Sequence, residues 1–123
     1  MKVLLIDDEE DVRRIASLSL RKVGRMEVVE ATGGEEGIEA ALRERPDVIL
    51  LDVLMPRLDG PATLSRLKAS ASAVASVPVV FLTGGASPRE AEALLALGAA
   101  GVLAKPFDPM TLPARLLEAL ARR

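Results

Sequence analysis

Several acidic, hydroxyl and basic side chains stand directly after short apolar runs, where a buried strand would end. Asp7 and Asp8 follow residues 3–6, Asp52 follows 48–51, Thr83 follows 79–82 and Lys105 follows 101–104. A carboxylate next to a buried apolar run is costly to bury unless it is paired. Their repeated position at strand ends makes these side chains the first candidates for a site with chemistry.

The residue types in this set indicate phosphoryl chemistry supported by a divalent cation. Carboxylates that gather at one place raise each other's pKa unless a cation joins them. The chain has no cysteine and no histidine, so an oxygen-bound ion such as Mg²⁺ is the expected partner. A carboxylate can attack a phosphoryl group while a metal and a lysine neutralise the developing charge. We therefore expect Asp52 to be a nucleophile and a metal ligand, with Lys105 and Thr83 opposite it.

The elements that must position these side chains alternate along the chain. Continuous apolar runs predict central parallel strands, and the weaker runs 26–30 and 101–104 suit sheet edges. Helices are predicted between the strands by apolar residues at spacings of three and four: Val12, Ile15, Ala16, Val23; Ile38, Ala41, Leu42; Leu64, Leu67, Ala71; Ala91, Leu94, Leu95; Leu112, Leu116, Leu117, Leu120.

Helix start and stop signals agree with this alternation. Capping-box spacing joins Thr32 to Glu35 and Ser87 to Glu90, and Asp108-Pro109 has the order of a cap followed by a first helical proline. Gly24 and Gly98 stand where helices would end. The dipeptides Met55-Pro56 and Asp59-Gly60 are interpreted as a turn.

Five such units predict one α/β domain over residues 1–123. The expected fold is flavodoxin-like: a doubly wound five-stranded parallel sheet of order 2-1-3-4-5 with five helices. In that order the chain changes direction between strands one and three, and ligands bind at the carboxyl ends of strands at such a point. The polar side chains named above would converge there.

Composition excludes other classes of partner and location. A net charge of −2 gives no general attraction for nucleic acid or anionic lipid, so we expect this domain to bind neither directly. The apolar runs are too short to span a membrane, and the N-terminus turns acidic too soon for a signal peptide. A cytoplasmic protein is expected.

Four segments together resemble a known family. "LLIDDEEDVRR", "LLDVLMPRLDG", "VVFLTGG" and "VLAKPFD" are similar to the CheY-like receiver domain of response regulators in two-component signalling. The resemblance implies that Asp52 is the phosphoacceptor, that Asp7, Asp8 and the Leu54 backbone carbonyl complete a Mg²⁺ site, that Thr83 is the switch hydroxyl, and that Lys105 contacts the phosphoryl group. It also implies a cis bond between Lys105 and Pro106, which would direct the lysine inward.

The function implied by the resemblance is a phosphorylation-controlled signalling switch. The phosphoryl donor would be a sensor histidine kinase or a histidine phosphotransfer protein. The domain would be no ordinary enzyme, because it would catalyse only its own phosphorylation and dephosphorylation. Changes in the loop and helix after strand four would alter the binding of an effector or attached output domain, whose identity the sequence leaves open.

The chain departs from the family at a few positions. Val102 stands three residues before Lys105, where many receivers carry Tyr or Phe that turns inward on activation. Leu54 and Gly85 stand where side chains often adjust water access to the phosphoryl group, so the rate of dephosphorylation stays open.

Other functions are compatible with parts of the same pattern. A phosphohydrolase of the haloacid-dehalogenase type would need a second Asp where Leu54 stands. A flavin carrier would need a hydroxyl-rich loop after the first strand and more aromatic residues than two Phe. A pseudo-receiver without phosphorylation is disfavoured by the full acidic set. Taken singly, Asp7 and Asp8 could cap a helix, and Thr83 could bond to nearby backbone.

Overall fold

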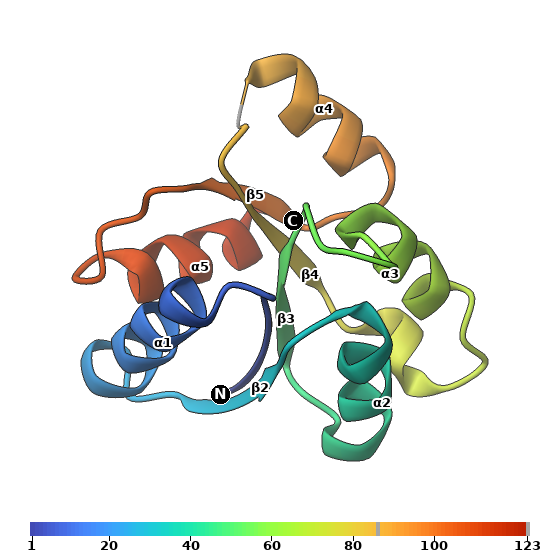
Figure 1. Ribbon diagram of the computed structural model, residues 1–123, viewed down its shortest axis with the longest axis horizontal. Helices are drawn as coiled ribbons and strands as arrows, with labels where there is room; N and C mark the ends of the chain where they lie inside the picture. The colour runs from blue at the N-terminus through green and yellow to red at the C-terminus, as the bar shows by residue number, and fades with distance from the viewer. Residues whose placement is uncertain (86, 123) are drawn as a thin grey trace.

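The computed structural model describes residues 1–85 and 87–122, and its elements alternate between strand and helix (Figure 1). The strands are β1 (Lys2–Ile6), β2 (Glu27–Ala31), β3 (Val48–Asp52), β4 (Val79–Thr83) and β5 (Gly101–Ala104). The helices are α1 (Glu10–Leu18), α2 (Gly34–Glu44), α3 (Gly60–Lys68), α4 (Pro88–Ala96) and α5 (Leu112–Ala121). A π-helical turn η1 (Ser19–Val23) continues α1, and a 3₁₀ turn η2 (Ala73–Ser76) precedes β4.

The five strands form one parallel sheet in the order β2-β1-β3-β4-β5. This order, with its five α-helices, confirms the predicted flavodoxin-like fold. The chain reverses direction between β1 and β3, which pair with Leu5 opposite Leu50. The switch point therefore lies where Asp7 and Asp52 end their strands.

Successive residues of each strand face opposite sides of the sheet, and each side has its own core. One side is covered by α1, η1 and α5, whereas the other is covered by α2, α3 and α4 (Figure 1). In β3, Val48 and Leu50 belong to the first core, and Ile49 and Leu51 belong to the second. All four are fully buried, which explains why this run shows no polar alternation in the sequence.

Helix boundaries are where sequence expectation and structure differ. α2 begins at Gly34 after an N-cap at Gly33, and Thr32 bonds to Glu36 rather than forming a capping box with Glu35. α5 begins at Leu112, later than the Asp108-Pro109 signal predicted. The prediction for Ser87 is confirmed, because its side chain accepts the N–H of Glu90 at 3.2 Å.

Some predicted stripe residues are wrong as core positions. Ala71 lies beyond the end of α3, and the side chains exposed to solvent are Ile15, Val23, Leu42, Leu95 and Leu117. Gly98 has φ 108° just after α4, as its helix-ending role requires. The predicted helix end at Gly24 is also confirmed, since this residue caps η1.

The turn before α3 does more than connect. Asp59 is the N-cap of α3 and accepts the N–H of Ala62 at 2.9 Å. Gly60 follows it and donates its N–H to the Val53 carbonyl at 2.8 Å. A Cβ atom at Gly60 would lie only 2.4 Å from the Asp52 carbonyl oxygen. The start of α3 is thus pressed against the end of β3, next to the acidic residues.

Candidate functional site

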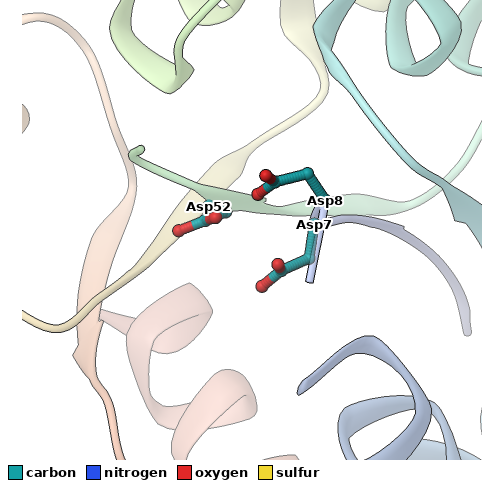
Figure 2. Close-up of side chains that lie close together, drawn as sticks. All are labelled: Asp7, Asp8 and Asp52. Carbon is teal, nitrogen blue, oxygen red and sulfur yellow. The ribbon is translucent and has the colours of Figure 1, made fainter. Parts of the chain in front are cut away.

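The carboxyl groups of Asp7, Asp8 and Asp52 gather at the switch point (Figure 2). One oxygen of each lies within 4.8 Å of the others. Asp7 and Asp8 follow β1 directly, and Asp52 is the last residue of β3, so the pairing of these strands brings the acids together. Asp7 and Asp52 are buried, whereas Asp8 is exposed.

Lys105 enters this acidic cluster from the loop after β5. Its Nζ lies 3.0 Å from Asp7 Oδ2, 3.2 Å from Asp52 Oδ1 and 3.6 Å from Glu9 Oε1. The Lys105–Pro106 peptide bond is cis, as the family resemblance implied. The amine therefore partly neutralises two buried carboxylates at once, a convergence that the strand-end pattern predicted.

Burial and charge shift the pKa values of the facing groups. Burial, with the nearby charge of Asp7, raises the pKa of Asp52 from 3.8 to about 6 although Lys105 opposes the rise. Burial alone would lower the pKa of Lys105, but its hydrogen bond to Asp7 and the charges of Asp7 and Asp52 raise it. With Lys105 in place, the negative charge of the carboxylates is therefore still not fully neutralised.

Besides Lys105, contacts from β2, from the loop after β1 and from α1 hold Asp7 in place. Its N–H donates to the Ala31 carbonyl at 3.2 Å at the end of β2. Its Oδ1 accepts the N–H of Glu9 at 2.9 Å, and its carbonyl accepts a hydrogen bond from Arg13 Nη1 at 2.8 Å. The sequence analysis did not identify Glu9 or Arg13 as contacts of Asp7. For Arg13, its place among the apolar positions at the start of α1 could have indicated that it is partly buried.

Thr83 and Leu54 stand apart from the lysine contacts. The buried Thr83 Oγ1 accepts the N–H of Gly85 at 3.1 Å, which is the bond to nearby backbone that the sequence offers as its alternative role. Leu54 is 79% exposed, and the role of its carbonyl as a ligand stays a prediction. Val102 is half-buried against the core that contains Leu94 of α4.

The donor set fits a hard divalent cation. All available ligand atoms are oxygens, and the carboxylates approach one another without enough positive charge to offset them. Mg²⁺ binds one or two carboxylates and keeps several waters, which an exposed Asp8 beside buried Asp7 and Asp52 allows. Bound there, the ion would also neutralise oxygens of a phosphoryl group.

Comparison with known proteins gives one consistent result. Residues 3–117 match the family described as response regulator receiver domain. The chain is 36% identical over 121 residues to a probable transcriptional regulator, ycf27, of Porphyridium aerugineum, covering 98% of this chain and 48% of that protein. It is 34% identical over 122 residues to the alkaline phosphatase synthesis transcriptional regulatory protein PhoP of Bacillus subtilis, covering 99% and 49%.

The fold is shared with a chemotaxis protein, CheY4 of Vibrio cholerae. That structure superposes with a TM-score of 0.87 at 36% identity and covers 97% of this chain and 98% of that one. The chain spans about half the length of the curated relatives it matches. Within residues 1–85 and 87–122, no helix is both long and apolar enough to cross a membrane.

Proposed function

Because this chain belongs to the response regulator receiver domain family, it is a phosphorylation-controlled signalling switch, and we propose that Asp52 is the residue that accepts the phosphoryl group. The observation that supports this assignment best is the pair of contacts from Lys105 to Asp7 and Asp52. Asp52 is buried, carries a raised pKa and ends a central strand, as a carboxylate kept for chemistry would.

In the proposed reaction a carboxylate oxygen of Asp52 attacks the phosphorus atom of a phosphohistidine on a partner. The phosphorus–nitrogen bond breaks, the imidazole leaves with the electron pair, and an acyl phosphate forms on Asp52. Lys105, already 3.2 Å from Asp52 Oδ1, would transfer its contact to a phosphoryl oxygen. The Thr83 hydroxyl would exchange its bond with Gly85 for another phosphoryl oxygen.

Asp7, Asp8, Asp52 and the Leu54 carbonyl would hold Mg²⁺ during this reaction. The metal would supply charge neutralisation, which self-catalysed phosphorylation and dephosphorylation both need. The phosphoryl donor would be a sensor histidine kinase or a histidine phosphotransfer protein. The partner that recognises the phosphorylated form would be a separate effector or an attached output domain.

Phosphorylation by acetyl phosphate tests the assignment. Intact-mass measurement should find one added phosphoryl group only when Mg²⁺ is present, and Asp52→Asn should abolish the addition. The matched control is Asp11→Asn, which removes an exposed acid from the first turn of α1 and should phosphorylate like the parent. Mg²⁺-dependent labelling that persists in Asp52→Asn would contradict the assignment.

A further inference from the structure

Arg13 links the acidic cluster to the edge strand of the sheet. Its Nη1 donates a hydrogen bond of 2.8 Å to the Asp7 carbonyl, and its Nε lies 3.3 Å from Glu30 Oε1 on β2. The Arg13 side chain is only 16% exposed. One guanidinium group therefore spans the space between the end of β1 and β2, where its planar fork can bind two acceptors at once.

Glu30 is itself fixed on the far side. Its second oxygen, Oε2, accepts the hydroxyl of the buried Ser17 at 3.1 Å, and that hydroxyl accepts a hydrogen bond from Arg21 Nε at 3.1 Å. Arg21 Nη2 donates to the Val28 carbonyl of β2 at 2.6 Å. The position of Arg13 is thus set by a chain of contacts between α1, η1 and β2.

Arg13 contacts Asp7, whose carboxylate the proposed site needs as a metal ligand. Beyond β1, Asp7 and the loop after it must turn so that the carboxylate faces Lys105 and Asp52. Arg13 pairs the Asp7 carbonyl, and the Glu9 N–H pairs its Oδ1. Fixing both the carbonyl and the carboxylate of one residue leaves its side chain few alternative orientations.

We propose that Arg13 is a positioning residue of the metal and phosphoryl site, held in place by Glu30 on β2. The inference rests on the proposed function, because it names the residues that orient the Asp7 ligand. Groups that orient metal ligands from behind are worth about 10-fold to 100-fold in metal affinity. Arg13 acts through Asp7 and touches neither the metal nor the phosphoryl group.

Charge alone makes the opposite prediction, which allows a sharp test. An arginine near a cation site repels the cation, so its removal should raise Mg²⁺ affinity if geometry plays no part. Arg14, the next residue of α1, pairs with Glu10 on the surface with both side chains about 70% exposed, 69% and 72%. Arg13→Gln and Arg14→Gln remove the same charge from neighbouring positions, but only the first breaks the contact with Asp7.

Mg²⁺ affinity measured by titration calorimetry on the full chain should fall about 10-fold in Arg13→Gln and stay near the parent value in Arg14→Gln. Equal affinities in the two variants, or a rise in Arg13→Gln, would overturn the inference while leaving the proposed function intact. A parent protein that binds no Mg²⁺ would contradict both. The failure of the inference and that of the proposed function are therefore distinguishable.

A second readout needs no metal. Amide hydrogen exchange at Glu9, whose N–H donates to Asp7 Oδ1, should quicken in metal-free Arg13→Gln and not in Arg14→Gln. If Arg13→Gln proves unfolded by circular dichroism, Glu30→Gln and its control Glu10→Gln decide the question, since they remove the negative charges that pair with Arg13 and Arg14. We expect Mg²⁺ affinity to fall in Glu30→Gln and not in Glu10→Gln. Equal Mg²⁺ affinities in these two variants would refute the role of Arg13.

Discussion

At the scale of single residues, Lys105 neutralises part of the charge of Asp7 and Asp52 in the metal-free protein. Its amine lies within 3.2 Å of an oxygen of each. A lysine so placed competes with an added cation for the same carboxylates. Thr83 makes its bond to Gly85 instead, so its hydroxyl should matter for the phosphoryl group and not for the metal.

Replacing Lys105 should therefore strengthen metal binding. We expect Lys105→Met to raise Mg²⁺ affinity by roughly 10-fold, about 1.4 kcal/mol, since a competing cation is removed. Thr83→Ala should bind Mg²⁺ like the parent. Both variants should respond less to a phosphoryl mimic such as beryllofluoride. Titration calorimetry checks the affinities, with Lys68→Met as the control for loss of an exposed lysine elsewhere. A large loss of Mg²⁺ binding in either site variant would show that its side chain belongs to the metal site.

At the scale of elements, α4 is the helix with the least anchorage among the residues that the structure describes. Leu94 is its buried residue, and the remaining positions of Pro88–Ala96 are exposed or half-buried. The loop before it contains Gly84 and Gly85, which permit large backbone changes. Ala86, in the loop after β4 that is predicted to change on activation, lies outside the described residues.

Activation should accordingly be concentrated in this loop and the start of α4. Val102 on β5 is β-branched, stiff in a strand and too short to fill the space that a moving Thr83 hydroxyl would vacate. Amide chemical shifts recorded with and without beryllofluoride should change mainly in residues 83–90. Val102→Phe restores an aromatic side chain and should extend the changes into β5. Changes confined to β5 in the parent, with residues 83–90 silent, would show that the strand carries the response.

Strand ends were easier to predict from the sequence than helix starts. Strand ends were predictable because a buried parallel strand is a continuous apolar run and its first charge marks the end, as at Asp52. Helix starts were harder to predict, because Asp and Thr side chains cap helices and also stabilise isolated turns. Asp108 Oδ1 accepts the N–H of Met110 in such a turn, so α5 begins only at Leu112.

Some contacts within the site could be predicted from the sequence, and others could not. The convergence of Asp7, Asp52 and Lys105 follows from parallel pairing alone, because carboxyl ends of neighbouring strands meet at one edge. The contact of Arg13 with the Asp7 carbonyl could not be predicted, since it depends on how α1 sits over β2. Periodicity indicates that α1 has an apolar face, but not its width, and Ile15 proved exposed.

At the scale of the whole molecule, the raised pKa of Asp52 makes stability depend on pH. The folded-state pKa of about 6 lies above the ordinary value of 3.8, so the folded protein holds this proton more tightly than the unfolded chain. The stabilising contribution is complete below about pH 4 and is lost as the pH rises through about 6. Above that range, ionised Asp52 lowers the free energy of unfolding.

Asp52→Asn should therefore stabilise the metal-free protein at neutral pH. We expect its free energy of unfolding to exceed that of the parent by ~1–3 kcal/mol at about pH 7.5, and the two to converge near pH 4. Urea unfolding followed by circular dichroism, with a chelator present, measures both. The exposed Asp11→Asn should stay within about 0.5 kcal/mol of the parent. An Asn variant less stable than the parent at about pH 7.5 would mean that the Lys105 contact outweighs the burial of Asp52.

The alternation of Leu50 and Leu51 between two cores has a genetic consequence. Asp52 is two residues after Leu50, so its side chain lies on the same face of the sheet, which α1 and α5 cover. Loss of one codon within β3 would move every strand residue before or after the deletion to the opposite face of the sheet. Leucines would meet the wrong helices, and the carboxylate would face away from Lys105 or leave the strand end. Apolar substitutions of similar volume at residues 48–51 should therefore be tolerated one at a time, whereas single-residue insertions and deletions in the strand should be absent among functional variants.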